Sequence, residues 1–311
     1  MTNNATLTTT VTGLKIKEIP NVLRSFEPTM RKPVVFDSPH SGQNYPAKTI
    51  FNYVCAHENL RYVEDTHVDD LIDNARKQGV TVLTALTPRS FVDLNRARDC
   101  LNPADIRGDW RKVQCDPSIS HMAQIGSGVV PVKTGQGLGA FLYHDSSKPD
   151  ADEINERLEN FYDPYHEKLD EIIQDIHEEF GLCYHVNCHS MPRTVSLEDF
   201  VVGNAFGRST DQDFSNFVRD TLRFHPLVKK NNWSVGVNTG IKSKLTGGEI
   251  IQRHGDPENN IHSVQLEVKR MHYMDENTRT PNAGYQDIKT VLDDLAEAVA
   301  EYALNKSFEL D

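Results

Sequence analysis

The sequence lacks the long apolar runs of membrane proteins and the basic excess of proteins that bind nucleic acids. No hydrophobic stretch approaches the roughly 20 consecutive apolar residues that span a bilayer. The 45 acidic residues outnumber the 33 basic ones, which leaves a formal net charge of −12. Because an acidic chain repels polyanions, we expect neither a nucleic acid nor a membrane as a partner.

Cysteine is also scarce, and its spacing forms no recognisable pair. The total is odd and no C-x-x-C occurs, which is typical of free thiols in a reducing compartment. The five cysteines are Cys55, Cys100, Cys115, Cys183 and Cys188. Residues 1–12 lack the basic start and apolar centre of a signal peptide, so we expect a flexible leader there. These features predict a cytoplasmic protein, either a monomer or a small homo-oligomer.

What is present is a chain of ordinary globular composition, with 311 residues of which 38% are hydrophobic. This length is enough for one large domain, which we place at residues 13–311. Apolar runs with β-branched residues predict strands at 34–36, 80–86, 90–94, 182–187, 200–202, 234–237 and 262–268. Helical spacing predicts helices at 68–77, 150–180 and 287–304, the second with a kink at Pro164. Alternating strands and helices predict an α/β fold, with a mostly parallel or mixed central sheet and helices on both faces.

A segment rich in glycine and proline interrupts this pattern near residues 100–145. Its glycines cluster at residues 126–139, and such segments often form a lid or a wall of an active site. A hairpin insertion without a catalytic role is the alternative, and composition does not separate the two.

Two histidines and a pair of carboxylates are candidate metal ligands. His40 and His189 each follow a predicted strand and lie in a turn of small residues, and Glu64 and Asp65 stand between them in the chain. Two imidazoles and one carboxylate are what a catalytic zinc site uses, with a fourth position for water. The alternatives are hydrogen-bonded structural histidines, and carboxylates that favour a helix start through its dipole. Spacing does not decide between Glu64 and Asp65.

Glu267 is the candidate general base because it lies within a predicted buried strand. A buried carboxylate is unfavourable unless it has a charge partner, a metal-bound water or a proton to transfer. Glu267 would take a proton from the attacking water and return it to the leaving amine. A salt bridge to Lys269 is the alternative, since residues two apart share one face of a strand, whereas Arg270 lies on the other face.

An acidic substrate needs a local basic patch in this acidic protein. Arg89, Arg96 and Arg98 cluster in one segment and Arg193 follows His189; guanidinium groups bind carboxylates in a bidentate way. The substrate-binding candidates are Arg89, Asn95, Arg96, Arg193, Gly247 and Gly248, the two glycines through their backbone amides. Solvated or ion-paired arginines, and an ordinary glycine turn, are the alternatives.

Several of these segments together resemble one known family. The segments are Val35–Gly42 with Tyr45-Pro46, Val63–Thr66, Pro88–Arg96, Pro164–His166, Asn187–Pro192, Val202–Asn204 and Gln265–Glu267. In this order, over roughly residues 34–275, the chain resembles the N-formylglutamate amidohydrolase (deformylase) family. The resemblance implies a zinc-hydrolase architecture related to the zinc carboxypeptidases and zinc amidases.

The resemblance also implies an activity, which is zinc-dependent hydrolysis of N-formyl-L-glutamate to formate and L-glutamate in histidine breakdown. It implies one zinc ion held by His40, Glu64 and His189, with Asp65 as the alternative to Glu64, and Glu267 as the base. The substrate would be a small acidic N-acyl amino acid.

Rival functions stay open at this stage. Residues 238–255 depart from the Asn-Pro-Tyr-rich stretch of the family, so another N-acyl amino acid or a small peptide is an alternative substrate. A binding protein without activity and an enzyme with Cys188 as its nucleophile are the other two.

Overall fold

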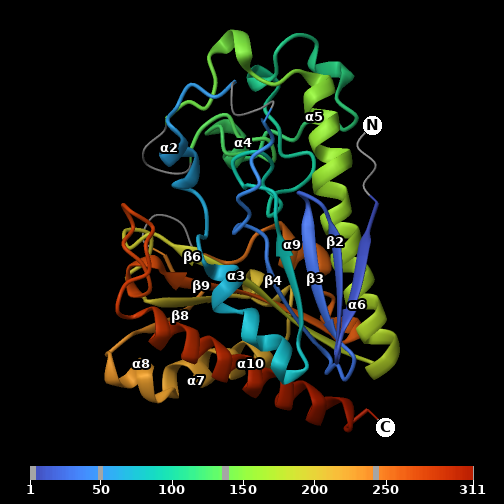
Figure 1. Ribbon diagram of the computed structural model, residues 1–311, viewed down its shortest axis with the longest axis vertical. Helices are drawn as coiled ribbons and strands as arrows, with labels where there is room; N and C mark the ends of the chain where they lie inside the picture. The colour runs from blue at the N-terminus through green and yellow to red at the C-terminus, as the bar shows by residue number, and fades with distance from the viewer. Residues whose placement is uncertain (1–4, 48–51, 135–139, 241–244, 311) are drawn as a thin grey trace.

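A mixed β-sheet forms the centre of the protein (Figure 1). The computed structural model describes residues 5–47, 52–134, 140–240 and 245–310. Within these residues the nine strands lie in the order β1-β2-β3-β5-β4-β6-β9-β7-β8. Their bounds are Leu7–Val11 (β1), Leu14–Ile19 (β2), Leu23–Pro28 (β3), Val34–Ser38 (β4), Thr81–Ala85 (β5), Cys183–Met191 (β6), Phe200–Gly203 (β7), Val235–Val237 (β8) and Ile261–Lys269 (β9).

The middle of the sheet is parallel and its two edges are not. Strands β5, β4, β6 and β9 pair in parallel, whereas β3 joins β5 and β7 joins β9 in antiparallel fashion. The carboxyl ends of β4, β6 and β9 therefore meet at one edge, which is where open α/β sheets bind ligands.

Helices cover both faces of the sheet, and alternation along β4 shows which helix lies where. Val34 and Phe36 belong to the core that holds α10, whereas Val35 belongs to the core that holds α6. Because successive strand residues point to opposite faces, α10 and α6 lie on opposite sides. The α10 side also carries α3, α7 and α8, and the α6 side carries α5 and α9 (Figure 1).

The helices have the following bounds. The α-helices are His57–Arg61 (α2), Val68–Leu71 (α3), His121–Gln124 (α4), Ala151–Arg157 (α5), Asp163–Phe180 (α6), Gln212–Phe224 (α7), Pro226–Lys230 (α8), Glu249–His254 (α9) and Tyr285–Ser307 (α10). The short 3₁₀ turns are Asp73–Gln78 (η1), Pro103–Asp105 (η2), Trp110–Lys112 (η3), Asp145–Ser147 (η4), Ala205–Gly207 (η6), Pro257–Asn259 (η7) and Arg270–His272 (η8). A π-helical turn, Leu158–Tyr162 (η5), joins α5 to α6.

The predicted α/β class is confirmed, together with most of its elements. Six of the seven predicted strands are present as β4 to β9, and the helices at 150–180 and 287–304 are present. The strand at 90–94 is wrong, because the amides of Phe91 and Val92 bond back to the carbonyl of Pro88 and form a turn. The helix at 68–77 is two short pieces, α3 and η1.

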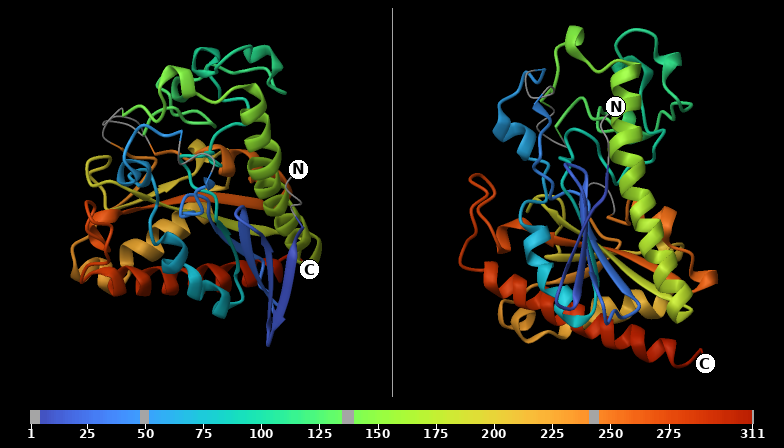
Figure 2. Two further views of the ribbon diagram at one scale, coloured as in Figure 1. Left: turned by 45° about the horizontal axis from the view of Figure 1, so that its top comes forward. Right: turned by 45° about the vertical axis from the view of Figure 1, so that its right-hand side comes forward.

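The N-terminal hairpin is the main element that the sequence analysis did not predict. Residues 7–11, which we assigned to a flexible leader, form β1 and pair in antiparallel register with β2. The left-handed Gly13, with φ +77°, turns the chain between the two strands, and threonines favour extended backbone. Figure 2 shows β1, β2 and β3 as a ribbon at one edge of the sheet. Residues 1–4 of the predicted leader lie outside the described residues.

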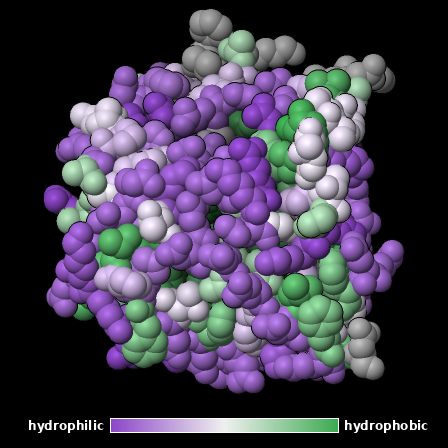
Figure 3. Space-filling view, turned by 60° about the horizontal axis from the view of Figure 1, so that its bottom comes forward, coloured by the Kyte–Doolittle hydropathy of each residue, from purple (hydrophilic) through white to green (hydrophobic). Residues whose placement is uncertain are grey.

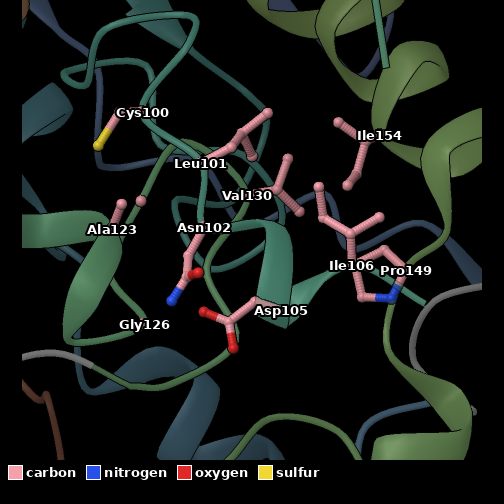
Figure 4. Close-up of a pocket in the computed structure, with 11 residues that line it drawn as sticks. Cys100, Leu101, Asn102, Asp105, Ile106, Ala123, Gly126, Val130, Pro149 and Ile154 are labelled. Atoms are coloured by element: carbon pink, nitrogen blue, oxygen red, sulfur yellow. The ribbon is translucent and has the colours of Figure 1, made fainter. Parts of the chain in front are cut away.

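The segment of residues 100–149 packs on α5 at the end of the molecule opposite α10 (Figure 2). The side chains of Leu101, Ile106 and Val130 from this segment and of Ile154 from α5 gather around a cavity of about 10 Å³ (Figure 4). Such a space holds at most about one water molecule, so the segment is packed and this cavity is no ligand site. Residues 135–139 of the glycine-rich run lie outside the described residues.

The opposite end of the molecule has no broad apolar surface in the view of Figure 3, where hydrophobic residues are scattered among hydrophilic ones. Phe214 of α7 and Leu295 of α10 are buried in the core instead. Of the helices in the described part of the chain, none is both long enough and apolar enough to cross a membrane.

Leu295 provides a test of the core between α10 and the sheet, because its side chain has no exposed area. Replacing it with alanine removes buried methyl groups and leaves a cavity, so Leu295→Ala should lower the free energy of unfolding by about 2–5 kcal/mol. Glu301→Ala, on the exposed side of the same helix, should change it by no more than about 0.5 kcal/mol. Urea denaturation measures both, and equal losses would contradict this packing.

Candidate metal and active site

The alternation of side chains along three parallel strands puts a row of polar groups on one face of the sheet. The register pairs Asp37 of β4 with Asn187 of β6, and His189 of β6 with Glu267 of β9. Residues at even intervals share a face, so their intervening neighbours Val186, Cys188 and Leu266 belong to the apolar core on the other face. The polar row is Asp37, His185, Asn187, His189, Ser263, Gln265 and Glu267.

His40, Asp65 and His189 form a buried group that could hold a metal ion. One ligand atom from each of the three residues lies within 4.8 Å of the others. Oδ2 of Asp65 is 2.9 Å from Nδ1 of His189 and 3.4 Å from Nδ1 of His40. The structure thus brings together two of the residues that the sequence analysis selected as ligands, and adds Asp65 rather than Glu64.

The turn that carries His40 fixes the position of Asp65. The amide of Asp65 donates to the carbonyl of His40 at 3.0 Å, and the hydroxyl of Ser41 donates to the carbonyl of Asp65 at 2.9 Å. Gly42 lets this turn pack against the next strand connection, since a Cβ there would lie 2.1 Å from the carbonyl oxygen of Thr87.

The second oxygen of Asp65 faces a buried cation. Oδ1 accepts from Nη2 of Arg270 at 2.8 Å and from the hydroxyl of Ser190 at 3.1 Å. Burial alone would raise the pKa of Asp65, but its contacts with His189 and His40 and the charge of Arg270 hold this pKa well below its usual range. Asp65 therefore presents an ionised carboxylate with one oxygen directed at the histidines.

Glu64 points away from this group. Its carboxylate accepts from the hydroxyl of Tyr45 at 2.6 Å, from Nε of Arg61 at 3.0 Å and from the hydroxyl of Thr66 at 3.3 Å. These three contacts use both of its oxygens, which is the structural reason that it does not join the two histidines.

The remaining nitrogen of each histidine ring has its own partner. Nε2 of His40 lies 2.8 Å from Oδ1 of Asp93, and Nε2 of His189 lies 2.7 Å from Oδ1 of Asn187. Histidines that bind metals usually donate their second N–H to such oxygens, which fixes the ring and frees the other nitrogen. Nδ1 of His40 is buried and has no hydrogen-bond partner in the described residues. A metal ion would satisfy this atom, so the residues present fit a metal.

Glu267 lies on β9, directly beside His189 of β6. Its Oε1 accepts a hydrogen bond from the side-chain nitrogen Nε2 of Gln265 at 2.9 Å. Burial raises the pKa of this carboxyl, and the negative charge of Asp65 raises it further. The alternative salt bridge to Lys269 is not present, because Nζ of Lys269 bonds to Asp199 and to the carbonyl of Leu197.

A cavity of about 550 Å³ opens beside the buried group, which is within the usual size range of small-molecule sites. His40, His189 and Glu267 line it. The segment of residues 100–149 supplies part of its wall, through residues such as Met122 and Lys133. Cys100 lines both this cavity and the small one described above.

Two of the four predicted arginines lie at the cavity. Arg89 donates through Nε to Oδ2 of Asp93 at 3.0 Å, and Nη2 of Arg96 is 3.8 Å from the same oxygen. Arg98 instead forms a two-point ion pair with Asp163, and it does not line the cavity. Arg193 is exposed and is also absent from the cavity wall.

Asn95, Gly247 and Gly248 also line the cavity. Nδ2 of Asn95 donates to Oε1 of Gln265 at 3.0 Å, and the amide of Gly248 donates to the same oxygen at 2.9 Å. A Cβ at position 248 would lie 2.4 Å from Oδ1 of Asn95, so this close approach requires glycine. The backbone amide of Gly248 is therefore already bonded to the side chain of Gln265, and that side chain in turn donates to Glu267.

Cys188 is not placed as a nucleophile. It points to the apolar face of the sheet, is 2% exposed, and its Sγ contacts the carbonyl of Val186. Burial raises the pKa of its thiol well above the ordinary value, which disfavours the reactive thiolate.

The sequence analysis missed several residues that shape the site, namely Asp37, Asp93, Asn187, Gln265 and Arg270. The alternation of polar residues at 185, 187 and 189, and again at 263, 265 and 267, was a signal for two strands with one polar buried face. Asp93 and Arg270 have no such local signal, because their roles depend on contacts across the fold.

Comparisons with known proteins agree with this architecture. The family model of the N-formylglutamate amidohydrolases matches residues 32–274. Curated N-formylglutamate deformylases of Pseudomonas putida and Pseudomonas aeruginosa are 26% and 27% identical to the chain over 254 residues. These matches cover 79% of the chain and 83% and 84% of the two relatives.

A solved structure gives the same result. The crystal structure of N-formylglutamate amidohydrolase from Ralstonia eutropha JMP134 superposes with a TM-score of 0.82 at 30% sequence identity, and covers 92% of this chain and 99% of its own. The protein is an amidohydrolase, and the chain belongs to the N-formylglutamate amidohydrolase family.

Proposed function

We propose that the protein hydrolyses the amide bond of N-formyl-L-glutamate, with a zinc ion held by His40, Asp65 and His189. The observation that carries this proposal is the buried group of two imidazoles and one carboxylate, which opens on a cavity whose lining includes Glu267, Arg89 and Arg96. The relatives named N-formylglutamate deformylase support the choice of substrate.

The donor set fits zinc, because two histidine nitrogens and one carboxylate oxygen are the protein ligands of many catalytic zinc sites. A zinc ion bound there would polarise the scissile carbonyl and lower the pKa of water toward neutrality. Asp65 is our candidate for the carboxylate ligand, since the oxygens of Glu64 accept hydrogen bonds from Tyr45, Arg61 and Thr66 instead.

Glu267 is the proposed proton carrier. It takes a proton from the water that attacks the formyl carbon, and it returns this proton to the nitrogen of the breaking C–N bond. Formate and L-glutamate are then the two products. Gln265 holds Oε1 of Glu267, and Gln265 is itself held by Asn95 and Gly248. The base therefore has a fixed position beside His189.

Arg89 and Arg96 are the proposed binding groups for the substrate carboxylates. Asp93 contributes one negative charge against these two cations, so these three side chains together carry one net positive charge. Asp93 also contacts His40, which places the arginines close to the metal group. Asp99, Glu249 and Glu267 line the same cavity, so the cavity as a whole has no excess of positive charge. An acidic substrate would therefore be held by directed contacts with the two guanidinium groups.

The choice between the two adjacent carboxylates can be tested with isosteric variants. Asp65→Asn should lose most zinc from the purified protein, because the ionised oxygen between the histidines becomes an amide. Glu64→Gln should keep one zinc per chain, since its carboxylate lies outside the group. Elemental analysis after dialysis measures both, and the reverse pattern would identify Glu64 as the ligand.

The role of Glu267 can be separated from metal binding. Glu267→Gln should lower kcat by about 10²–10⁴-fold, which is the usual contribution of a general base, while zinc content stays unchanged. Glu249→Gln is the control, because Glu249 also lines the cavity but lies outside the metal group. A wild-type kcat in Glu267→Gln would remove Glu267 from the mechanism.

A substrate panel tests the proposed function itself. The zinc-loaded protein should release formate from N-formyl-L-glutamate, and should turn over N-formyl-L-leucine and N-acetyl- or N-succinyl-L-glutamate much more slowly. Preference for another N-acyl amino acid or for a small peptide would replace the substrate, and no turnover of any compound would contradict the hydrolase assignment.

The same panel tests the arginine pair. Loss of a hydrogen bond to a charged group is worth about 1.5–3 kcal/mol, so Arg89→Met should raise KM for N-formyl-L-glutamate about 10–100-fold. Arg98→Met is the matched control from the same segment and should leave KM unchanged, because Arg98 pairs with Asp163 instead.

A further inference from the structure

We propose that Asp37, which lies behind the metal group and not in the cavity wall, is a positioning residue for His189 and acts through the amide of Asn187. It keeps the ring proton of His189 on Nε2, which leaves Nδ1 as the nitrogen that binds a metal. This inference rests on the proposed function in one respect, namely that His189 is a metal ligand.

Asp37 is fully buried in β4 and is surrounded by hydrogen-bond donors. Its Oδ2 accepts from the hydroxyl of Tyr165 at 2.7 Å, and its Oδ1 accepts from Nε2 of His185 at 2.8 Å and from Nδ2 of Asn187 at 2.7 Å. Burial works against ionisation, but the contacts with His185, Asn187 and Tyr165 lower the pKa of Asp37 below its ordinary value.

An ionised carboxylate accepts hydrogen bonds and cannot donate one. Asn187 must therefore turn its NH₂ group toward Asp37, and this leaves its Oδ1 facing His189. The distance from that oxygen to Nε2 of His189 is 2.7 Å. Since an amide oxygen also only accepts, Nε2 must carry the proton in this contact.

A second neighbour acts in the opposite direction. Nδ2 of Asn95, a donor, lies 3.1 Å from the same Nε2 of His189 and would favour a ring without a proton there. The orientation of Asn95 is fixed as well, because its Oδ1 accepts from the amide of Ile250 and its Nδ2 donates to Gln265. At Nε2 the ring of His189 thus lies between an acceptor and a donor, and the shorter contact is the one that Asp37 orients. At Nδ1 the ring faces Oδ2 of Asp65 at 2.9 Å, and this carboxylate accepts a proton from Nδ1 unless a metal ion takes the place of that proton. The ring with its proton on Nε2 alone is therefore the form that Asp37 supports in the metal-bound protein.

The other histidine of the metal group has no such competition. Nε2 of His40 faces the carboxylate of Asp93 directly, at 2.8 Å. His40 is therefore positioned by a carboxylate in contact with it, and His189 by a carboxylate one amide away. Loss of Asp37 should affect His189 specifically.

Two measurements on protein with ¹⁵N-labelled histidine test this inference. The first is the NMR signal of a proton bound to Nε2 of His189, recorded with excess zinc at about pH 8, because a bound metal ion takes the place of the Nδ1 proton beside Asp65. The second is zinc affinity, measured by competition with a chelator. Wild-type protein should show the Nε2 proton. Asp37→Ala should lose or weaken that signal and should bind zinc about 10–100-fold less tightly, which is the usual effect of removing such a supporting group.

Asn187→Leu is the second variant, in case Asp37→Ala does not fold. It has a similar volume, removes the acceptor and leaves Asp37 in place, and it should show the same two changes. Asp199→Ala is the matched control, because Asp199 accepts from Nε2 of His272 at 2.7 Å and from Lys269, away from the metal group. It should change neither the His189 signal nor zinc affinity.

The inference is overturned if wild-type protein lacks the Nε2 proton. It is also overturned if either folded variant keeps both this proton and wild-type zinc affinity. The NMR readout needs no substrate. A zinc-loaded wild-type protein that shows the Nε2 proton but does not hydrolyse N-formyl-L-glutamate would therefore contradict the proposed function and leave the orientation by Asp37 supported.

Discussion

A β-strand sends successive side chains to opposite faces of its sheet, and the site of this protein depends on that constraint in three adjacent parallel strands. Apolar and polar residues alternate along β6. Val186 and Cys188 therefore pack into the core with α10, while Asn187 and His189 face the site. A shift of register by one residue in β6 would exchange the two sets. The same alternation in β9 places Glu267 beside His189.

Burying this many polar groups is unfavourable unless each has a partner, and the contacts around the site supply them. Asp65 lies between two histidine rings on one side and Arg270 on the other. Asp93 is shared among His40, Arg89 and the amide of Asn95. The same carboxylate therefore contacts a candidate metal ligand, His40, and a candidate substrate-binding group, Arg89. One hydrogen-bond network holds both side chains in position.

The fold was largely predictable from the sequence, since short apolar segments with β-branched residues and helical spacing fix elements such as β9, α6 and α10 locally. The candidate site was predictable only in part. His40, His189 and Glu267 stand out because chemically distinctive residues follow or occupy apolar strands. The side-chain direction of Glu64 or Asp65 could not be predicted, because it depends on the contact between the amide of Asp65 and the carbonyl of His40.

Elements without a strong local pattern were missed for a related reason. The exposed strand β1 is stabilised by pairing with β2, and its sequence, in which three threonines separate Leu7 from Val11, carries little apolar alternation. In β2, Leu14 and Ile16 do alternate with Lys15 and Lys17, but the segment is short and only half-buried. The strand at residues 90–94 was predicted from the apolar Phe91, Val92 and Leu94, but the chain forms a turn there, with Arg89 and Asp93 in a buried polar contact. In both cases tertiary contacts outweighed local propensity.

We propose that His40, Asp65 and His189 bind one metal ion through Nδ1, Oδ2 and Nδ1. Anomalous X-ray diffraction at the zinc absorption edge, from crystals of the zinc-loaded protein, tests this arrangement. We expect a single strong peak among these three atoms, with Nε2 of each histidine still directed at Asp93 and Asn187. A peak beside Glu64, a peak at an Nε2 atom, or no peak between the two histidines would contradict it.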